Sequence, residues 1–141
     1  MKQYLDEESR KAIVKYRNAK SDMALKEADV LAQTGLYDSA VTRLYYACYY
    51  ITCALLIKNG IEATTHVGVK RMLSLKFVVS GLLDRKYINI YSNLLNGRKL
   101  SDYEDFIYQT SNSFTKFRDE ATDYCVAIKA LINREIKKDS D

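Results

Sequence analysis

The segment from Tyr37 to Lys58, YDSAVTRLYYACYYITCALLIK, constrains the fold of this chain more than any other. Residues 44–57 include no charged side chain, and Thr52 is the only clearly polar one among them. An amphipathic surface helix keeps polar residues on its solvent side, whereas this segment is apolar on nearly every side. With Asp38 and Arg43 at one end, the apolar run is shorter than the roughly 20 residues that a membrane span needs. We therefore expect a helix buried on most of its surface by other segments or by a second copy of the chain.

The remaining composition favours long helices in a single domain over residues 1–141. The chain has no proline and only five glycines, so few residues interrupt helices. A chain of this length can bury roughly 70% of its unfolded surface in one core. The net charge of +4 permits contact with nucleic acid without arguing for it.

Helical periodicity predicts an all-α bundle of four or five helices with up-and-down connections. The expected helices span residues 4–34, 37–58, 66–79, a fourth from near Asp84, and 112–136, followed by a polar tail at 137–141. Gly35, Asn59-Gly60 and Gly81 are helix-ending signals, and Thr64 or Thr65 is the expected N-cap of the third helix.

The end of the fourth helix has two interpretations. Ser101-x-x-Glu104 fits a capping box, which would start a new helix at Ser101 and leave Arg98 in a linker. Alternatively the helix continues through Gly97, at a cost of about 1 kcal/mol, and ends near Tyr103. In a continuous helix Arg98 and Asp102 share a face, whereas Arg98 and Tyr103 differ by about 140° of rotation.

No metal, cofactor or membrane is expected. The three cysteines, Cys48, Cys53 and Cys125, form no CxxC motif, and the single histidine, His66, belongs to no HExxH motif. The first ten residues lack the apolar core of a signal peptide, so we expect a cytoplasmic protein.

Tyrosines and basic residues are the remaining candidates for function. Tyr45, Tyr46, Tyr49 and Tyr50 lie on two adjacent helix faces, where they can pack in a core or dimer interface or stack on unpaired bases. Arg43 and His66 each have two interpretations, a structural hydrogen bond or ion pair and a functional role.

The segments YDSAVTRLYYA (37–47), THVGV (65–69) and Arg98…Asp102-Tyr103 occur in the order found in HEPN domains. The chain resembles this family over about residues 16–134, in particular its small stand-alone bacterial branch. The resemblance implies a five-helix bundle that dimerises around its central helices, and often a partnership with a minimal nucleotidyltransferase in a toxin–antitoxin-like pair. Many members are metal-independent ribonucleases, and others bind RNA or nucleotides without catalysis.

Active members carry an arginine followed, after four to six residues, by a histidine. Here Arg98 fits the arginine, but Tyr103 stands where the histidine is expected, and a phenol with a pKa near 10 is a poor general base at neutral pH. The resemblance therefore predicts an endoribonuclease weakened by this tyrosine, with Arg98, Asp102 and Tyr103 as catalytic residues. The expected RNA- or nucleotide-binding residues are Arg98, Lys99, Arg43 and His66, and the dimer interface comprises Tyr45, Tyr46, Tyr49 and Tyr50.

Two alternatives stay open at this stage. The chain could be a non-catalytic dimeric interaction or nucleotide-binding module in which Arg98 and Asp102 form a structural ion pair, worth only about 0.3–0.5 kcal/mol if exposed. Tyr103 could also be an acceptor for nucleotide transfer by the partner enzyme.

Overall fold

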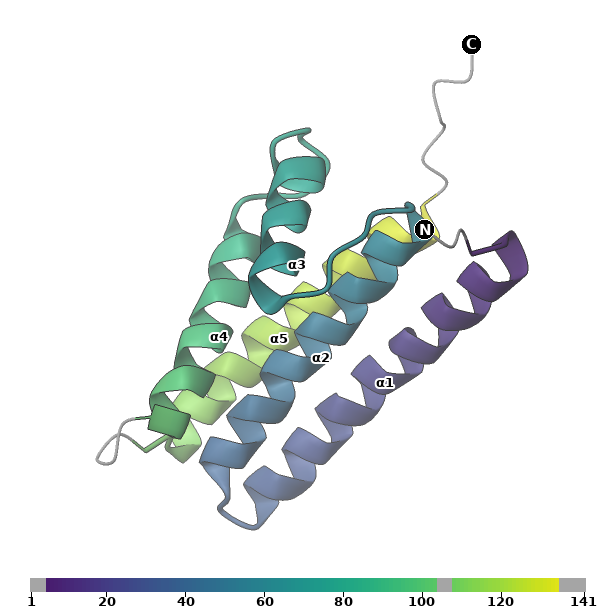
Figure 1. The fold of residues 1–141 in the computed structure, drawn as a ribbon. Coiled ribbons are helices and arrows are strands. Elements are labelled where there is room, and N and C mark those ends of the chain that lie inside the picture. The colour runs from purple at the N-terminus through teal and green to yellow at the C-terminus, as the bar shows by residue number, and fades with distance from the viewer. Residues whose placement is uncertain (1–4, 104–107, 135–141) are drawn as a thin grey trace.

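The computed structural model describes residues 5–103 and 108–134, and for residues 99–103 it describes the helical backbone alone. Its elements are α1 (Glu7–Gln33), α2 (Tyr37–Lys58), α3 (His66–Leu73), a π-helical turn η1 (Ser74–Val78), α4 (Lys86–Tyr103) and α5 (Ser111–Asn133). The described residues include no strand, which confirms the expected all-α bundle (Figure 1).

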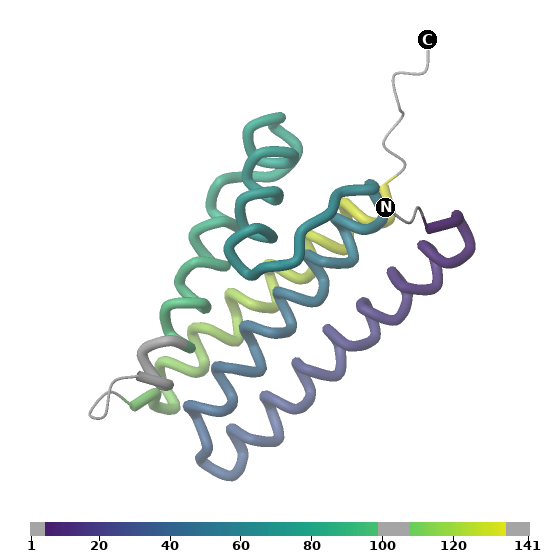
Figure 2. Tube along the Cα trace, viewed as in Figure 1, coloured from purple at the N-terminus to yellow at the C-terminus, as the bar shows by residue number. Residues whose placement is uncertain are grey.

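The long helices alternate in direction along the chain. In Figure 1, α1 and α4 run opposite to α2 and α5, while the short α3 lies beside α4. Helix α2 is central, because α1, α3, α4 and α5 all contact it. The connection between α2 and α3 runs back along α2 before α3 begins (Figure 2).

Helix α2 is buried on most of its surface, as its apolar sequence predicts. Twelve of its side chains are buried, including Leu44, Tyr45 and Ile51, which have no exposed surface. Its length and mean hydropathy of 1.3 would also suit a membrane span, but 67% of its most apolar window is buried inside the bundle. Burial within the protein therefore accounts for its composition.

The contact between α1 and α2 is made by small side chains. Ser21, Ala24 and Ala28 are fully or almost fully buried along α1. The Ser21 hydroxyl donates a 2.7 Å hydrogen bond to the Ala47 carbonyl of α2. The two helices therefore approach closely although α1 buries little apolar area.

The predicted helix ends are largely confirmed. Gly35 and Gly60 follow α1 and α2 with φ of 78° and 69°, a left-handed conformation that glycine adopts without steric cost. Of the two candidate caps for α3, Thr65 is the cap, since its hydroxyl accepts a 2.9 Å hydrogen bond from the Gly68 amide.

The third helix is not α-helical throughout. It changes at Ser74 into η1, where the Val79 amide donates to the Ser74 carbonyl, five residues earlier. Its buried residues are spaced four apart, at Val69, Leu73 and Phe77, and each such step overshoots one α-helical turn by about 40°. A wider π turn brings Phe77 back toward the core.

Helix α4 is continuous through Gly97, so Ser101 does not start a new helix. Its start is capped by Asp84, whose carboxylate accepts a 2.8 Å hydrogen bond from the Lys86 amide. A Cβ at Gly97 would lie 3.3 Å from Cζ of Phe117 on α5, so the absence of a side chain allows this close packing.

Helix α5 begins with a capping box formed by Thr110 and Ser113. Just before it, the Gln109 amide donates a 2.6 Å hydrogen bond to the Asp38 carboxylate, which ties this connection to the start of α2. The apolar residues that α5 directs at the core, from Phe114 to Ile132, are buried, except that Phe117 is half-buried.

Candidate functional site

Aromatic and basic side chains from α2, α3 and α4 meet beside the first half of α2. We call this group the aromatic–basic cluster. It comprises Arg43, Tyr45, Tyr46, Tyr49, Tyr50, His66, Tyr91 and Arg98. The α2 members recur at three- and four-residue spacing and therefore lie on adjoining faces. Helix α4 contributes Tyr91 and Arg98, which are seven residues, or two turns, apart and so share the face directed at α2.

Two guanidinium groups lie close to the ring of Tyr46. Cζ of Arg43 is 4.9 Å from the ring centroid, and Cζ of Arg98 is 5.2 Å from it. Arg98 also lies 5.6 Å from the centroid of Tyr45. At these distances the ring quadrupoles attract the cations, which holds both arginines on the same small area.

His66 is held by a hydrogen bond and by stacking. Its Nδ1 lies 2.5 Å from the Tyr45 hydroxyl, which in turn lies 3.1 Å from the Tyr91 hydroxyl. The His66 ring stacks on Tyr49, with centroids 4.3 Å apart and an interplanar angle of 25°. Because α3 begins at His66, directly after its Thr65 cap, the helix start fixes the position of this ring.

Burial keeps the central phenols protonated. It raises the pKa of Tyr45 to about 12, an effect only partly offset by the Tyr91 hydrogen bond and the Arg98 charge. Burial also raises the pKa of Tyr49 to about 12 and the pKa of Tyr91 further still. With Tyr45 neutral, the tautomer of His66 decides whether the phenol donates to Nδ1 or accepts a proton from it.

These raised pKa values predict alkaline destabilisation. Below pH 10 both the folded and unfolded states hold the phenolic protons, whereas above pH 10 the unfolded state ionises first. We expect the free energy of unfolding, measured by urea denaturation, to fall as the pH rises from 10 toward 12. The Tyr45→Phe variant should show a smaller fall. An equal fall in this variant would show that Tyr45 does not contribute.

The cluster extends onto α1 through two further cations. Nζ of Lys20 lies 4.7 Å from the centroid of Tyr50, and the charge of Arg17 opposes the rise in the pKa of Tyr49. Arg17 and Lys20 are not among the site residues predicted from the sequence. Their approach to the tyrosines depends on the packing of α1 on α2, which brings Ser21 and Ala24 of α1 into the core.

The structure brings together Arg43, Arg98, His66 and the four tyrosines of the predicted site. Tyr46, Tyr49 and Tyr50 are half-buried. Tyr45 has no exposed surface, because the chain's own helices cover it, and its assignment to a dimer interface stays a prediction. Tyr91, which has no exposed surface, is a member of the cluster that was not among the predicted site residues.

The other predicted site residues lie at the end of α4. Lys99, Asp102 and Tyr103 belong to its last turns, but their side chains lie outside the described residues, so their assigned roles stay predictions. Within residues 5–98 and 108–134, no three His, Cys, Asp or Glu side chains are grouped so that they could hold a metal ion.

The bundle and the cluster define a small helical protein with a cationic aromatic site. The sequence model of the HEPN domain matches residues 14–138, which is most of the chain, and the chain therefore belongs to the HEPN domain family.

Relatives in other organisms support this assignment. A UPF0332 protein of Thermotoga maritima is 28% identical over 120 residues, which cover 85% of this chain and 91% of the relative. Two proteins of Methanocaldococcus jannaschii, named putative toxin MJ0142 and putative toxin MJ0605, are 31% and 35% identical. Those matches cover 60% and 56% of this chain, and they span 58% and 59% of the two relatives.

Proposed function

We propose that this chain is a toxin-like HEPN protein that binds single-stranded RNA through the aromatic–basic cluster. The observation that carries the proposal is the position of Arg43 and Arg98 against half-buried Tyr46. Family membership and the names of the two archaeal relatives support the toxin-like role.

The cluster offers both kinds of contact that single-stranded RNA uses. Guanidinium groups bind phosphate oxygens in bidentate pairs, and aromatic faces stack on bases without selecting a sequence. Arg43 and Arg98 would contact phosphates, while Tyr46, Tyr49 and Tyr50 would supply the stacking surface. Arg17 and Lys20 extend the positive surface along α1.

His66 is the best candidate for proton transfer if the RNA is cleaved. It is the cluster's one side chain of a type that ordinarily titrates between pH 5 and 8. The high pKa of Tyr45 keeps that phenol neutral, and its hydrogen bond with Nδ1 fixes the imidazole. In such a reaction Arg98 would stabilise the negative charge that develops on the phosphate.

The biological setting of the proposal follows the family. We expect a cytoplasmic homodimer in which the half-buried tyrosines of α2 approach a second copy, and a nucleotidyltransferase as the partner that restrains it. A dimer would bring two copies of Arg98 to one symmetry axis and would double the number of phosphate contacts.

Binding of a 12-nucleotide single-stranded RNA, measured by fluorescence anisotropy at 50 and 200 mM salt, tests the proposal. We expect two to four phosphate contacts. A plot of the logarithm of the association constant against the logarithm of the salt concentration should then have a slope of about −1.4 to −2.8. Gel analysis of the same RNA would separate binding from cleavage. No binding at 50 mM salt, or an affinity independent of salt, would rule the proposal out.

A second candidate function is a non-catalytic interaction module. The half-buried tyrosines on α2 favour it, because aromatic residues are enriched in protein interfaces. Light scattering that shows a stable dimer, together with no RNA binding at low salt, would favour this function over the first.

A further inference from the structure

A groove of about 430 Å³ lies between α3, the π turn η1 and the start of α4. The short α3 lies beside α4 at this edge of the bundle (Figure 1). We call this surface the α3–α4 groove. It is lined by four aliphatic side chains, two cations and one serine. None of these residues belongs to the aromatic–basic cluster, so the groove is a separate surface.

The aliphatic side chains of the groove are left uncovered by the bundle. Val67 and Val79 are 70% and 74% exposed, the highest values for large aliphatic side chains within residues 5–98 and 108–134. Leu75 lies between them in the chain and is 49% exposed, and Ile88 of α4 also lines the groove. Exposed apolar side chains that are grouped in this way, unlike scattered ones, mark interaction surfaces.

The π turn keeps the outer row of this helix in line. Val67, Arg71, Leu75 and Val79 follow one another at four-residue steps, offset by two residues from the buried row that ends at Phe77. An offset of two residues is about 200° of rotation, so the two rows face in nearly opposite directions. The wider turn of η1 offsets the drift of both rows. The outer row is therefore a strip of roughly 18 Å along the helix.

The groove is basic as well as apolar. Lys70 and Arg71 line it, and no carboxylate is among the described residues that do so. Residues 63–83 contain three lysine and arginine residues and no aspartate or glutamate. Within residues 5–98 and 108–134, neither Lys70 nor Arg71 forms an ion pair. A partner with complementary charge would therefore be acidic.

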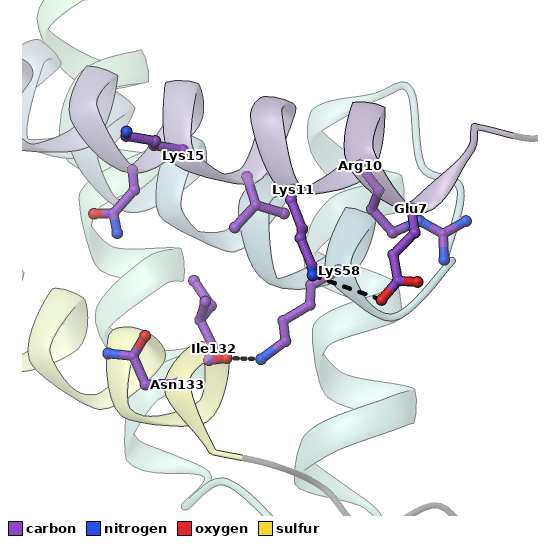
Figure 3. Close-up of a pocket in the computed structure, with 9 residues that line it drawn as sticks. Glu7, Arg10, Lys11, Lys15, Lys58, Ile132 and Asn133 are labelled. Carbon is purple, nitrogen blue, oxygen red and sulfur yellow. Dashed lines mark hydrogen bonds and ion pairs between the residues drawn. The ribbon is translucent and has the colours of Figure 1, made fainter.

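The cations of a larger hollow already have contacts within the chain. That hollow, of about 770 Å³, lies between the start of α1 and the C-terminal ends of α2 and α5 (Figure 3). There Lys11 lies 3.7 Å from the Glu7 carboxylate, and Lys58 donates to the Ile132 carbonyl. The two cations of the α3–α4 groove, in contrast, remain for a partner molecule.

The chemistry of the groove determines the kind of occupant. Single-stranded RNA stacks on aromatic faces, and the described lining of the groove contains none. A second copy docked groove to groove would bring four cations together with no carboxylate among the described lining residues. The described residues offer no strand edge that an extended peptide could join, whereas a helix can lie along an apolar strip.

We propose that the α3–α4 groove docks an acidic amphipathic helix of a partner protein. Apolar side chains of that helix, spaced three and four residues apart, would pack against Val67, Leu75 and Val79. Its flanking aspartates or glutamates would pair with Lys70 and Arg71. A helix of about 12 residues covers the strip. This docking does not depend on the proposed RNA site, because the two surfaces share no residue.

A fluorescein-labelled synthetic peptide of 18 residues tests the groove. It carries leucine at positions 4, 8, 11 and 15 and glutamate at most other positions, and its binding to the full chain is measured by anisotropy in 150 mM salt. One comparison peptide has serine in place of every leucine, and another has lysine in place of every glutamate. We expect both to bind at least about tenfold more weakly than the acidic amphipathic peptide, because each lacks one of the two complementary features.

Val67→Ser/Val79→Ser removes the most exposed apolar contacts and should weaken binding of the acidic amphipathic peptide at least about tenfold. Both side chains are largely exposed, so the core stays intact. The matched control is Val30→Ser/Val126→Ser, which changes two exposed valines outside the groove and should leave the affinity unchanged.

Lys70→Gln/Arg71→Gln removes the positive charge of the groove and should also weaken binding at least about tenfold. Its matched control is Lys26→Gln/Lys116→Gln, which removes two exposed lysines outside the groove. An equal loss in this control would show that net charge alone attracts the peptide and would refute the site.

The proposal would also be refuted by absence of binding of the acidic amphipathic peptide, by equal binding of the serine peptide, or by unchanged affinity in either groove variant. Sedimentation of the chain with phosphatidylserine vesicles, lost in Val67→Ser/Val79→Ser and found without peptide binding, would make the groove a lipid contact instead. Loss of binding of the 12-nucleotide RNA in Lys70→Gln/Arg71→Gln would make these cations part of an RNA path and would overturn the proposal as well.

Discussion

Replacing Arg98 with alanine is expected to weaken RNA binding at least about tenfold. The substitution removes a guanidinium that lies within 6 Å of the centroids of both Tyr45 and Tyr46. In the proposed complex it would also remove a charge-assisted contact to phosphate, a kind of contact worth about 1.5–3 kcal/mol. The slope of affinity against salt should become shallower by about the contribution of one phosphate contact. Anisotropy titrations at several salt concentrations would measure both effects.

Two further variants separate this role from a general effect of charge. Arg85→Ala removes an exposed arginine just before α4 and should leave RNA affinity unchanged. Arg98→Lys keeps the charge but loses the planar fork that binds phosphate at two points, so its affinity should lie between those of the other two. Equal RNA affinity in Arg98→Ala and in the unmodified chain would remove Arg98 from the site.

Replacing Ile128 with alanine is expected to destabilise the fold by about 2–5 kcal/mol. Ile128 lies in the second half of α5 with no exposed surface, and α5 packs against α2. The loss combines the lost burial of the removed methyl and methylene groups with the cavity that they leave. For a chain of this size the loss corresponds to a fall in Tm of roughly 6–20 °C.

Val126→Ala is the matched control, because Val126 lies on the same helix but is 62% exposed. Its replacement should change the free energy of unfolding by less than about 0.5 kcal/mol. Urea denaturation followed by circular dichroism would compare the variants. A loss below 1 kcal/mol in Ile128→Ala would contradict the packing of α5 against α2.

The sequence predicted the helices well because their limits depend on local chemistry. Thr65 caps the start of α3 through a hydrogen bond with an amide three residues later. Gly35 and Gly60 end α1 and α2 through their own left-handed backbone conformation. Two features depend instead on packing between helices. The continuation of α4 through Gly97 depends on the close packing of Phe117 against that glycine. The π-helical turn η1 depends on the burial of Phe77 in the core.

The candidate site was predictable in its residue types but not in its arrangement. Arg43 and the tyrosines are adjacent in sequence, whereas the hydrogen bonds from Tyr91 through Tyr45 to His66 join three helices. The spacing of apolar residues predicts which face of α4 is buried. It does not predict which side chains of α2 that face contacts. For the same reason the positions of Arg17 and Lys20 near the tyrosines followed only from the packing of α1 on α2.

The packing of α2 has a consequence for synthesis of the chain. Helices α1 and α2 are joined by a three-residue connection, so their contacts are local and can form early. The remaining surface of α2 is covered by α3, α4 and α5, the last of which ends at Asn133. At ordinary elongation rates, about 4–15 s pass between synthesis of Lys58 and synthesis of Asn133. During that interval the most apolar helix of the protein lacks the cover that α5 provides, so we expect the nascent chain to be more prone to aggregation than the finished bundle.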